Sequence, residues 1–194
     1  MNAHRVSLGQ AHFKRLYDDN EDPWQFRTSA YEQAKYHATV AALANRTFRS
    51  AFEVGCSIGE MTRLLAPRCK AMLAVDIIEQ PLTAARTTCA HQPWVRFACM
   101  QVPQTWPDGT FDLIVLSEVL YFLSPADVAA VADRAAFSLA ADGIVVLVNW
   151  TGRSGDPCTG EEAASLFIER AQDWLELRTH LRETGYRLDV LGRR

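Results

Sequence analysis

The chain has 194 residues, of which 48% are hydrophobic and 22% charged, and its formal net charge is -3. This length suits one globular domain with a full hydrophobic core. The slight acidity excludes the strongly basic field with which proteins bind nucleic acid or anionic lipid. The longest apolar run, near residues 144–148, is far too short for a membrane span. We therefore expect no nucleic-acid partner and no stable membrane insertion.

The cysteines and histidines carry no pattern of a metal site or a disulfide framework. The five cysteines include no C-x-x-C pair, and the five histidines lack ligand spacing. Free thiols in a reducing compartment are the favoured interpretation. The first residues contain no continuous apolar segment of the kind that a secretion signal needs. Together these features predict a cytoplasmic protein without a bound metal.

Residues 1–50 carry two amphipathic helix patterns, the second of which begins at the capping box Ser29–Glu32. The stretch "NEDPWQFRTS" between them is irregular, yet it holds Trp24 and Arg27. Trp24 in this turn has two interpretations. It fastens the helix to the sheet, or it belongs to a lid that closes over a ligand.

Residues 51–150 alternate short apolar runs with helical segments, which is typical of a doubly wound α/β domain with a mostly parallel sheet. Pro81 and the cap Ser124–Asp127 mark helix starts, and Asp108-Gly109 and Asp142-Gly143 predict turns before the fourth and fifth strands. The expected strands are Ala51–Val54, Ala71–Val75, Val95–Ala98, Leu113–Leu116 and Ile144–Val148.

The C-terminal segment alternates apolar and polar residues on both sides of Thr184-Gly185, which predicts an antiparallel hairpin that completes the sheet. We expect one domain over residues 1–194. It comprises an N-terminal helical cap or lid (1–50), a core (51–150), and a C-terminal helix with the hairpin (151–194).

The stretch "FEVGCSIGEMT" at residues 52–62 places two glycines four positions apart after an expected strand. Aligned on Gly55, the dinucleotide fingerprint G-x-G-x-x-G would need glycines at Ser57 and Glu60. The carboxylate of Glu60 would repel a pyrophosphate at the helix N-terminus, so a dinucleotide is disfavoured. The frame E/D-x-G-x-G-x-G fits better, because Glu53, Gly55 and Gly59 match it and Ser57 takes the middle glycine place.

This second frame resembles the first motif of class I S-adenosylmethionine (SAM) methyltransferases. SAM carries a cationic sulfonium and no phosphate, so acids near the loop are tolerated. The resemblance implies a Rossmann-like seven-stranded sheet, SAM as cofactor and S-adenosyl-L-homocysteine as product. It implies that Asp76 accepts the ribose hydroxyls, although capping of the next helix is the alternative. The expected cofactor-binding residues are Trp24, Arg27, Glu53, Gly55, Cys56, Ser57, Gly59, Asp76, Ile77, Met100, Gln101, Val102, Ser117 and Glu118.

The residues after the fourth strand bear on the methyl acceptor. "SEVLY" at 117–121 lacks the N/D-P-P-Y motif of enzymes that methylate nucleic-acid bases, so base methylation is not expected. The stretches "DPWQFRTSAYEQAKYHATVAAL", "AFEVGCSIGEMTRLLAPRC" and "FDLIVLSEVLYFL" resemble the nodulation protein S (NodS) family. That resemblance implies transfer of a methyl group to the free amine at the non-reducing end of a deacetylated chitooligosaccharide in Nod factor synthesis. We expect a monomer.

Glu118 is the carboxylate that we expect to orient the amine, to accept its proton or to attract the cation. The alternatives are that it contacts the cofactor or caps the following turn. Tyr121 is the second candidate for orienting the amine, and Tyr121, Asn149 and Trp150 are the expected substrate-binding residues. Three other functions stay open: methylation of another small-molecule amine or hydroxyl, SAM binding without catalysis, and an NAD-dependent dehydrogenase.

Overall fold

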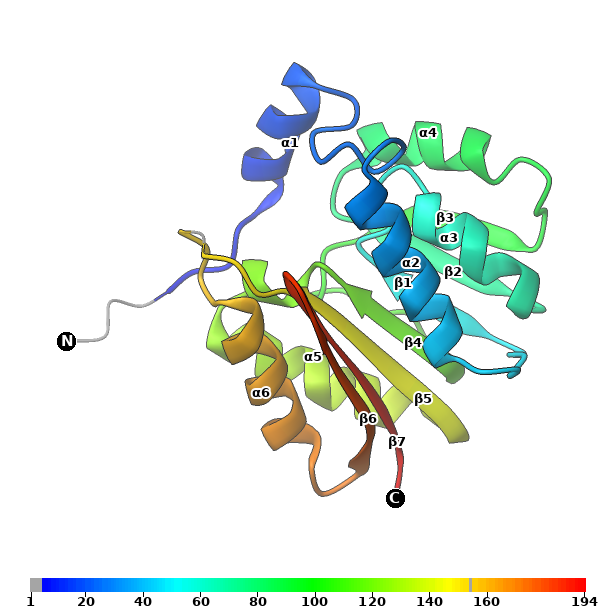
Figure 1. Ribbon diagram of the computed structural model, residues 1–194, viewed down its shortest axis with the longest axis vertical. Helices are drawn as coiled ribbons and strands as arrows, with labels where there is room; N and C mark the ends of the chain where they lie inside the picture. The colour runs from blue at the N-terminus through cyan, green and yellow to red at the C-terminus, as the bar shows by residue number, and fades with distance from the viewer. Residues whose placement is uncertain (1–4, 154) are drawn as a thin grey trace. The chain divides into compact units, whose positions relative to one another are not determined.

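The structure is a computed structural model that describes residues 5–153 and 155–194 (Figure 1). The chain divides into two compact units. Residues 9–101 form one of them, and residues 102–194 together with the segment before Gly9 form the other.

The unit of residues 9–101 contains three parallel strands in the order β3-β2-β1. Ala51 pairs with Met72, and Met72 pairs in turn with Val95. The elements in chain order are α1 (Gln10–Asp19), α2 (Ala30–Ala42), β1 (Ala51–Val54), α3 (Glu60–Leu65), the 3-10 turn η1 (Ala66–Arg68), β2 (Met72–Asp76), α4 (Glu79–Thr88) and β3 (Val95–Cys99).

The other unit contains four strands in the order β4-β5-β7-β6. Strands β4 and β5 are parallel, whereas β7 runs antiparallel to both β5 and β6. Helices α5 and α6 lie side by side in this unit (Figure 1). Its elements are β4 (Phe111–Ser117), η2 (Leu120–Phe122), α5 (Pro125–Ser138), β5 (Leu139–Trp150), α6 (Gly160–Ala171), β6 (Leu175–Glu183) and β7 (Tyr186–Arg193).

Side-chain caps explain where three helices begin. The hydroxyl of Ser29 accepts a hydrogen bond from the backbone N–H of Glu32, as the capping box predicts. Ser124 caps α5 through Asp127 N–H, with Pro125 at the first helical position. Thr159 caps α6 in the same way. Each cap satisfies a backbone donor that the helix itself leaves without an acceptor.

The predicted strands are confirmed, with bounds that differ by one or two residues at β2, β3 and β4 and by more at β5. The run 113–116 in β4 and the run 144–148 in β5 are fully buried, as expected of strands covered on both faces. The turn expected at Asp142-Gly143 is wrong, because β5 begins at Leu139 and contains both residues. The register of β4 against β5 shifts between Phe111 and Leu113, which absorbs the extra length of β5 at this end.

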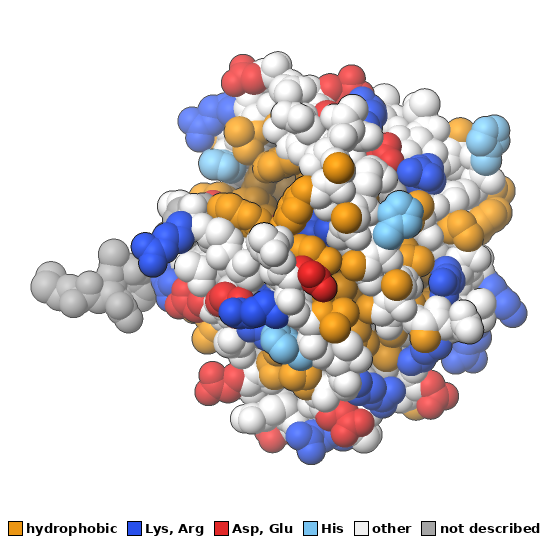
Figure 2. All heavy atoms as spheres, in the orientation of Figure 1, with side chains coloured by type: hydrophobic (Ala, Val, Ile, Leu, Met, Phe, Trp, Pro, Cys, Tyr) orange, Lys and Arg blue, Asp and Glu red, His pale blue; other side chains and the backbone are white. Residues whose placement is uncertain are grey.

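The predicted fold class is confirmed. Alternating strands and helices give a mostly parallel arrangement of seven strands, and the C-terminal hairpin β6–β7 supplies its antiparallel part. Within the described residues no helix combines the length and apolarity that crossing a membrane requires. On the face shown in Figure 2, acidic and basic side chains occur together rather than gathering by sign.

Candidate functional site

The loop after β1 has the backbone of a ligand-binding turn. Gly55 and Gly59 have φ angles of 80° and 83°, and Ser57 between them has a φ of 46°. A Cβ at Gly59 would lie 3.0 Å from both Cα and Cβ of Ala85, so this position needs glycine for space as well as for conformation. The N–H groups of Gly55 and Cys56 both donate to the carbonyl of Val75, which fixes the loop against the end of β2.

Asp76 closes β2 beside this loop. Its side chain is buried, and Oδ2 accepts a hydrogen bond from Ser57 N–H at 2.9 Å while Oδ1 accepts one from Ile78 N–H at 3.0 Å. Burial raises the pKa of Asp76 to about 6, although the backbone donors oppose the rise. The N-cap of α4 (Glu79–Thr88) is Ile78 and has no side-chain cap, so the bond from Ile78 N–H holds the turn before the helix rather than capping it. The two carboxylate oxygens together have four lone pairs, so the carboxylate keeps acceptor capacity for a ligand hydroxyl.

Glu53, expected to bind the cofactor, lies beneath the loop. It is 1% exposed, and its Oε2 accepts a hydrogen bond of 2.6 Å from the hydroxyl of Thr62 in α3. Burial raises the pKa of Glu53 to about 7, and the bond from Thr62 partly offsets this. This hydrogen bond joins β1 to α3, the two elements between which the loop lies.

Helix α1 contributes a residue that the sequence did not single out. The hydroxyls of Tyr17 and Ser57 lie 2.6 Å apart, and both side chains are buried. Tyr17 also packs edge-to-face on Trp24 at 5.7 Å between ring centroids. In the sequence Tyr17 stands four positions after Phe13, a spacing that predicts the buried face of any amphipathic helix, so it gave no separate signal.

The irregular stretch between α1 and α2 is ordered around Asp22. Its carboxylate accepts the backbone N–H groups of Phe26 and Arg27. The ring of Trp24 stacks on Phe26 of the same stretch at 5.5 Å between ring centroids. The guanidinium of Arg27 binds Glu21 at 3.0 Å. Arg27 and Glu21 line a groove of about 690 Å³. Its other lining residues belong to α4 and are Gln80, Thr83, Ala84, Thr87 and Thr88.

Three further expected cofactor residues in this unit are placed as follows. The side chain of Cys56 belongs to a core cluster with Ala74 and Leu82, and its backbone bonds to Val75 and Gly59 shape the loop. The carbonyl of Ile77 accepts a hydrogen bond from Gln10 in α1. Met100 N–H donates to the carbonyl of Asp76, which places it directly after β3 and next to the end of β2.

A second polar group lies in the unit of residues 102–194, at the C-terminal ends of β4 and β5. Glu118 follows β4 with a φ of 59°, a conformation that costs a non-glycine residue free energy and is frequent at functional sites. Its Oε2 accepts hydrogen bonds from the Tyr121 hydroxyl at 2.8 Å and from Trp150 N–H at 3.2 Å. The structure therefore brings together three predicted residues of this group. Two further residues of this unit that were expected to bind the cofactor, Ser117 and Val102, are both buried.

Asn149 in β5 is fully buried, and neither atom of its amide has a hydrogen-bonding partner among the described residues. Such a group is costly in a folded protein and is uncommon. A Cβ at Gly160 would lie 1.9 Å from the carbonyl oxygen of Trp150 and 3.1 Å from Cβ of Asn149. The first residue of α6 must therefore be glycine for the helix to approach this end of β5.

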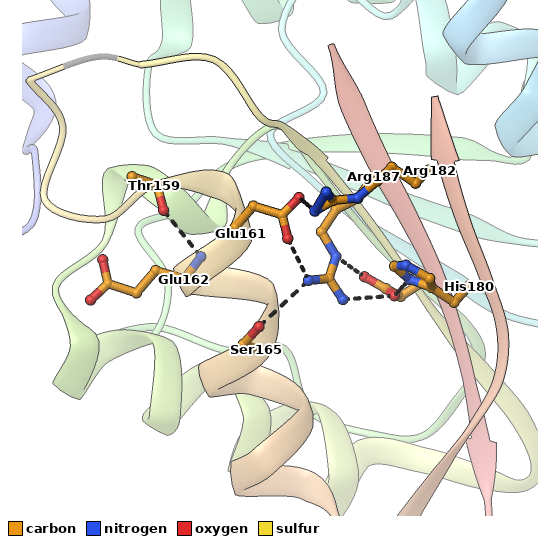
Figure 3. Close-up of polar contacts among 8 residues, drawn as sticks. Thr159, Glu161, Glu162, Ser165, His180, Arg182 and Arg187 are labelled. Atoms are coloured by element: carbon orange, nitrogen blue, oxygen red, sulfur yellow. Dashed lines mark hydrogen bonds and ion pairs between the residues drawn. The ribbon is translucent and has the colours of Figure 1, made fainter. Parts of the chain in front are cut away.

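A network of charged side chains joins α6 to the β6–β7 hairpin in the same unit (Figure 3). Arg187 binds Asp189 through two hydrogen bonds of 2.8 and 2.9 Å, and its third nitrogen binds Glu161 at 3.0 Å. His180 Nδ1 lies 2.7 Å from Asp189, whose side chain is completely buried, and Arg182 binds Glu161. This network could not be predicted from the sequence, because its members lie on a helix and two strands that meet only in the folded chain.

The residues around the glycine loop fit SAM. The loop turns sharply through residues with positive φ angles, and the carboxylate of Asp76 beside it retains acceptor capacity for a ligand hydroxyl. The described residues contain no cluster of three or more His, Cys, Asp or Glu side chains that could hold a metal ion.

Comparisons of the whole chain define the class to which this fold belongs. One similar solved structure is the crystal structure of the N-methyltransferase NodS from Bradyrhizobium japonicum WM9 in complex with S-adenosyl-L-homocysteine. It superposes with a TM-score of 0.81 and is 21% identical, and the match covers 94% of this chain and 97% of that chain. A candidate methyltransferase from Pseudomonas syringae superposes with a TM-score of 0.73 at 32% identity, over 85% of this chain and 100% of that chain. The fold is that of the class I methyltransferases.

The sequence identifies the family within this class. The family model of nodulation protein S (NodS) matches residues 10–151, and the chain belongs to this family. Nodulation protein S from Sinorhizobium fredii (strain NBRC 101917 / NGR234) is 34% identical over 112 residues, which are 57% of this chain and 51% of that protein. The matched segment thus spans about half the length of this curated relative.

Proposed function

We propose that this protein transfers a methyl group from SAM to the free amine of the non-reducing-end glucosamine of a deacetylated chitooligosaccharide, a step of Nod factor synthesis. The observation that carries the proposal is the glycine loop with Asp76 at the end of β2, in a chain of the NodS family. The complex of a family member with S-adenosyl-L-homocysteine supports the choice of cofactor.

The residues of the chain have separate tasks in this proposal. Asp76 accepts the ribose hydroxyls with the lone pairs that its backbone donors leave. When bound, SAM supplies a methyl carbon that is already reactive, so no covalent enzyme intermediate is needed. Glu118 orients the acceptor amine and takes the proton that the amine must lose to expose its lone pair. Tyr121 O–H and Trp150 N–H hold Oε2 of Glu118 in place for this. Positioning of two reactants is worth up to about 7–11 kcal/mol, and it supplies much of the rate.

The acceptor is recognised by Tyr121, Asn149 and Trp150 in the proposal. An aromatic face and a planar amide are the groups with which proteins commonly hold sugars. The buried amide of Asn149, which has no partner within the described residues, supports its role in binding a polar ligand. We also propose that the protein acts as a monomer in the cytoplasm, where its cysteines stay reduced. None of the five, all of which lie in the described part of the chain, forms a disulfide.

Two measurements test the proposal. Calorimetric titration with S-adenosyl-L-homocysteine and, separately, with NAD should give heat of binding only with the first. Radiolabelled SAM should then label a chitooligosaccharide with a deacetylated terminus and leave the fully acetylated oligomer unlabelled. Binding without any labelling would favour a non-catalytic SAM-binding protein, and labelling of simple amines or alcohols alone would favour the small-molecule alternative. Binding of NAD alone would point to a dehydrogenase.

A further inference from the structure

Ser57 makes two contacts that a glycine in its place could not both make. Its side-chain oxygen lies 2.6 Å from the hydroxyl of Tyr17 in α1, while its backbone N–H donates to Oδ2 of Asp76. The first contact depends on the hydroxyl, and the second depends on the orientation of the peptide group. One residue of the loop therefore joins α1 to the carboxylate at the end of β2.

This contact is enclosed by the protein. Tyr17 is 3% exposed and Ser57 is 7% exposed, so water does not readily replace either hydroxyl partner. Ser57 also has a φ of 46°, in the left-handed region that a serine seldom adopts without support from its surroundings. A buried hydrogen bond to a residue in such a conformation restricts the ways in which the loop can rearrange.

Two more hydrogen bonds attach α1 to the segment that follows Asp76. Gln10 at the start of the helix donates to the carbonyl of Ile77 at 3.1 Å. Gln80 donates to the carbonyl of Tyr17 at 2.8 Å. The helix is therefore held at both ends against residues 77–80, and Tyr17 lies where the helix meets the loop.

We propose that Tyr17 is a positioning residue for the cofactor, which acts by holding Ser57 so that the Ser57 N–H stays on Asp76 and the carboxylate keeps its orientation toward the ribose. The inference rests on the proposed function, because it concerns the same cofactor. It extends that function by assigning α1 a defined part in cofactor affinity. Tyr17 touches neither reacting group, and its influence passes entirely through Ser57.

The test is a double-mutant cycle on cofactor binding with the full chain. Tyr17→Phe keeps the ring against Trp24 and removes only the hydroxyl, and Ser57→Ala removes only its partner. Each variant should weaken binding of S-adenosyl-L-homocysteine about three- to tenfold by calorimetry, as expected for the loss of one buried hydrogen bond. The double variant should be no weaker than either single one, because both remove the same interaction. KM for SAM should rise in parallel while kcat changes less than twofold.

Controls separate this role from general packing. Tyr31→Phe removes the hydroxyl of a tyrosine in α2 and should leave the affinity unchanged. Ser57→Gly offers a second variant without the hydroxyl that also relieves the left-handed backbone, so a loss of affinity there cannot arise from strain. Unchanged affinity in folded Tyr17→Phe and Ser57→Gly proteins would overturn the inference. So would a double variant whose loss of affinity equals the product of the two single losses. Absence of binding by the wild-type protein would instead refute the proposed function.

Discussion

The backbone N–H of Ser57 donates a hydrogen bond of 2.9 Å to Oδ2 of Asp76, nineteen positions further along the chain. This bond joins the loop after β1 to the end of β2, and both partners are buried. The hydrogen bond from the Ser57 backbone thus fixes the orientation of the Asp76 carboxylate before a ligand binds. If the cofactor binds this carboxylate, its affinity should fall when Asp76 is removed and when Asp76 is protonated.

Replacing Asp76 by alanine should weaken binding of S-adenosyl-L-homocysteine by about 1–3 kcal/mol, because the ribose hydroxyls and Ser57 N–H lose a charged acceptor. Calorimetry on folded protein measures the change. Asp108→Ala, in an exposed turn, is the matched control and should bind as the wild type does. Equal affinity in the Asp76 variant would show that the carboxylate does not bind the ribose.

The same affinity should depend on pH. Burial raises the pKa of Asp76 to about 6, and donors from a ribose favour the charged form. Binding should therefore be strongest above pH 6 and should weaken as the pH falls through 6, because protonation removes an acceptor. Titrations over this range measure the effect, and Asp76→Asn should remove the dependence. A wild-type affinity that does not vary with pH would contradict the ribose contact.

Glu53 should make stability depend on pH in the opposite sense to a carboxylate in a salt bridge. Burial raises the pKa of Glu53 from 4.5 to about 7, so the folded chain holds a proton that the unfolded chain releases. The contribution is fully present below pH 4.5 and is lost as the pH rises through 7. One pKa unit corresponds to about 1.4 kcal/mol, so the loss amounts to about 3 kcal/mol.

Urea unfolding between pH 5 and pH 8 checks this decrease. Glu53→Gln keeps an acceptor for Thr62 and should flatten the profile without removing it. The remaining slope comes from Asp76, whose raised pKa acts with the same sign. A variant with the full wild-type slope would show that Glu53 is ionised in the folded protein throughout this range.

Changing Glu118 to glutamine should separate binding from turnover. The side chain keeps its shape and an acceptor for Tyr121 and Trp150 N–H, but it can no longer take a proton. Affinity for S-adenosyl-L-homocysteine should stay within a few-fold, while turnover should fall roughly 10²-fold or more. Turnover near the wild-type value would exclude Glu118 as the base, and collapse of cofactor affinity would assign it to the cofactor instead.

Arg187 should be required for stability. Arg187→Met leaves the fully buried carboxylate of Asp189 without its bidentate partner, and loss of one partner from a buried ion pair costs about 3–5 kcal/mol. Denaturant unfolding measures the loss. Arg178→Met on the neighbouring strand is the control, because that arginine is exposed and should contribute little. A small loss in the Arg187 variant would contradict a stabilising role of this ion pair.

Strands β1, β2, β4 and β5 were predictable because each contains an apolar run that is largely buried, whereas β3 is only partly buried. The bounds differ by one or two residues at β2, β3 and β4. The helix starts at Ser29 and Ser124 followed from capping chemistry that is local in the sequence. Strand β5 extends beyond its prediction, because Leu139 pairs with Phe111 of β4. Asp142-Gly143, whose local preference is for a turn, lie in the strand at the register shift between this pair and the next.

The candidate site was predictable where a residue has a fixed place relative to a strand end, as Asp76 and Glu118 have. It was not predictable where contacts depend on tertiary packing. Tyr17 had the same helical spacing as any core residue, and the partner of Arg27 is set by the turn that Asp22 organises. The charge network around Arg187 likewise exists only once β6 and β7 pair.

The central claim is methyl transfer to a sugar amine, and mass spectrometry of the products tests it most directly. Two chitooligosaccharides of equal length, one deacetylated at its non-reducing end and one fully acetylated, are incubated with the wild-type protein and SAM. We predict a mass increase of one methyl group in the deacetylated oligomer alone, located by fragmentation on the terminal amine. No increase in either oligomer, or an equal increase in both, would contradict the claim.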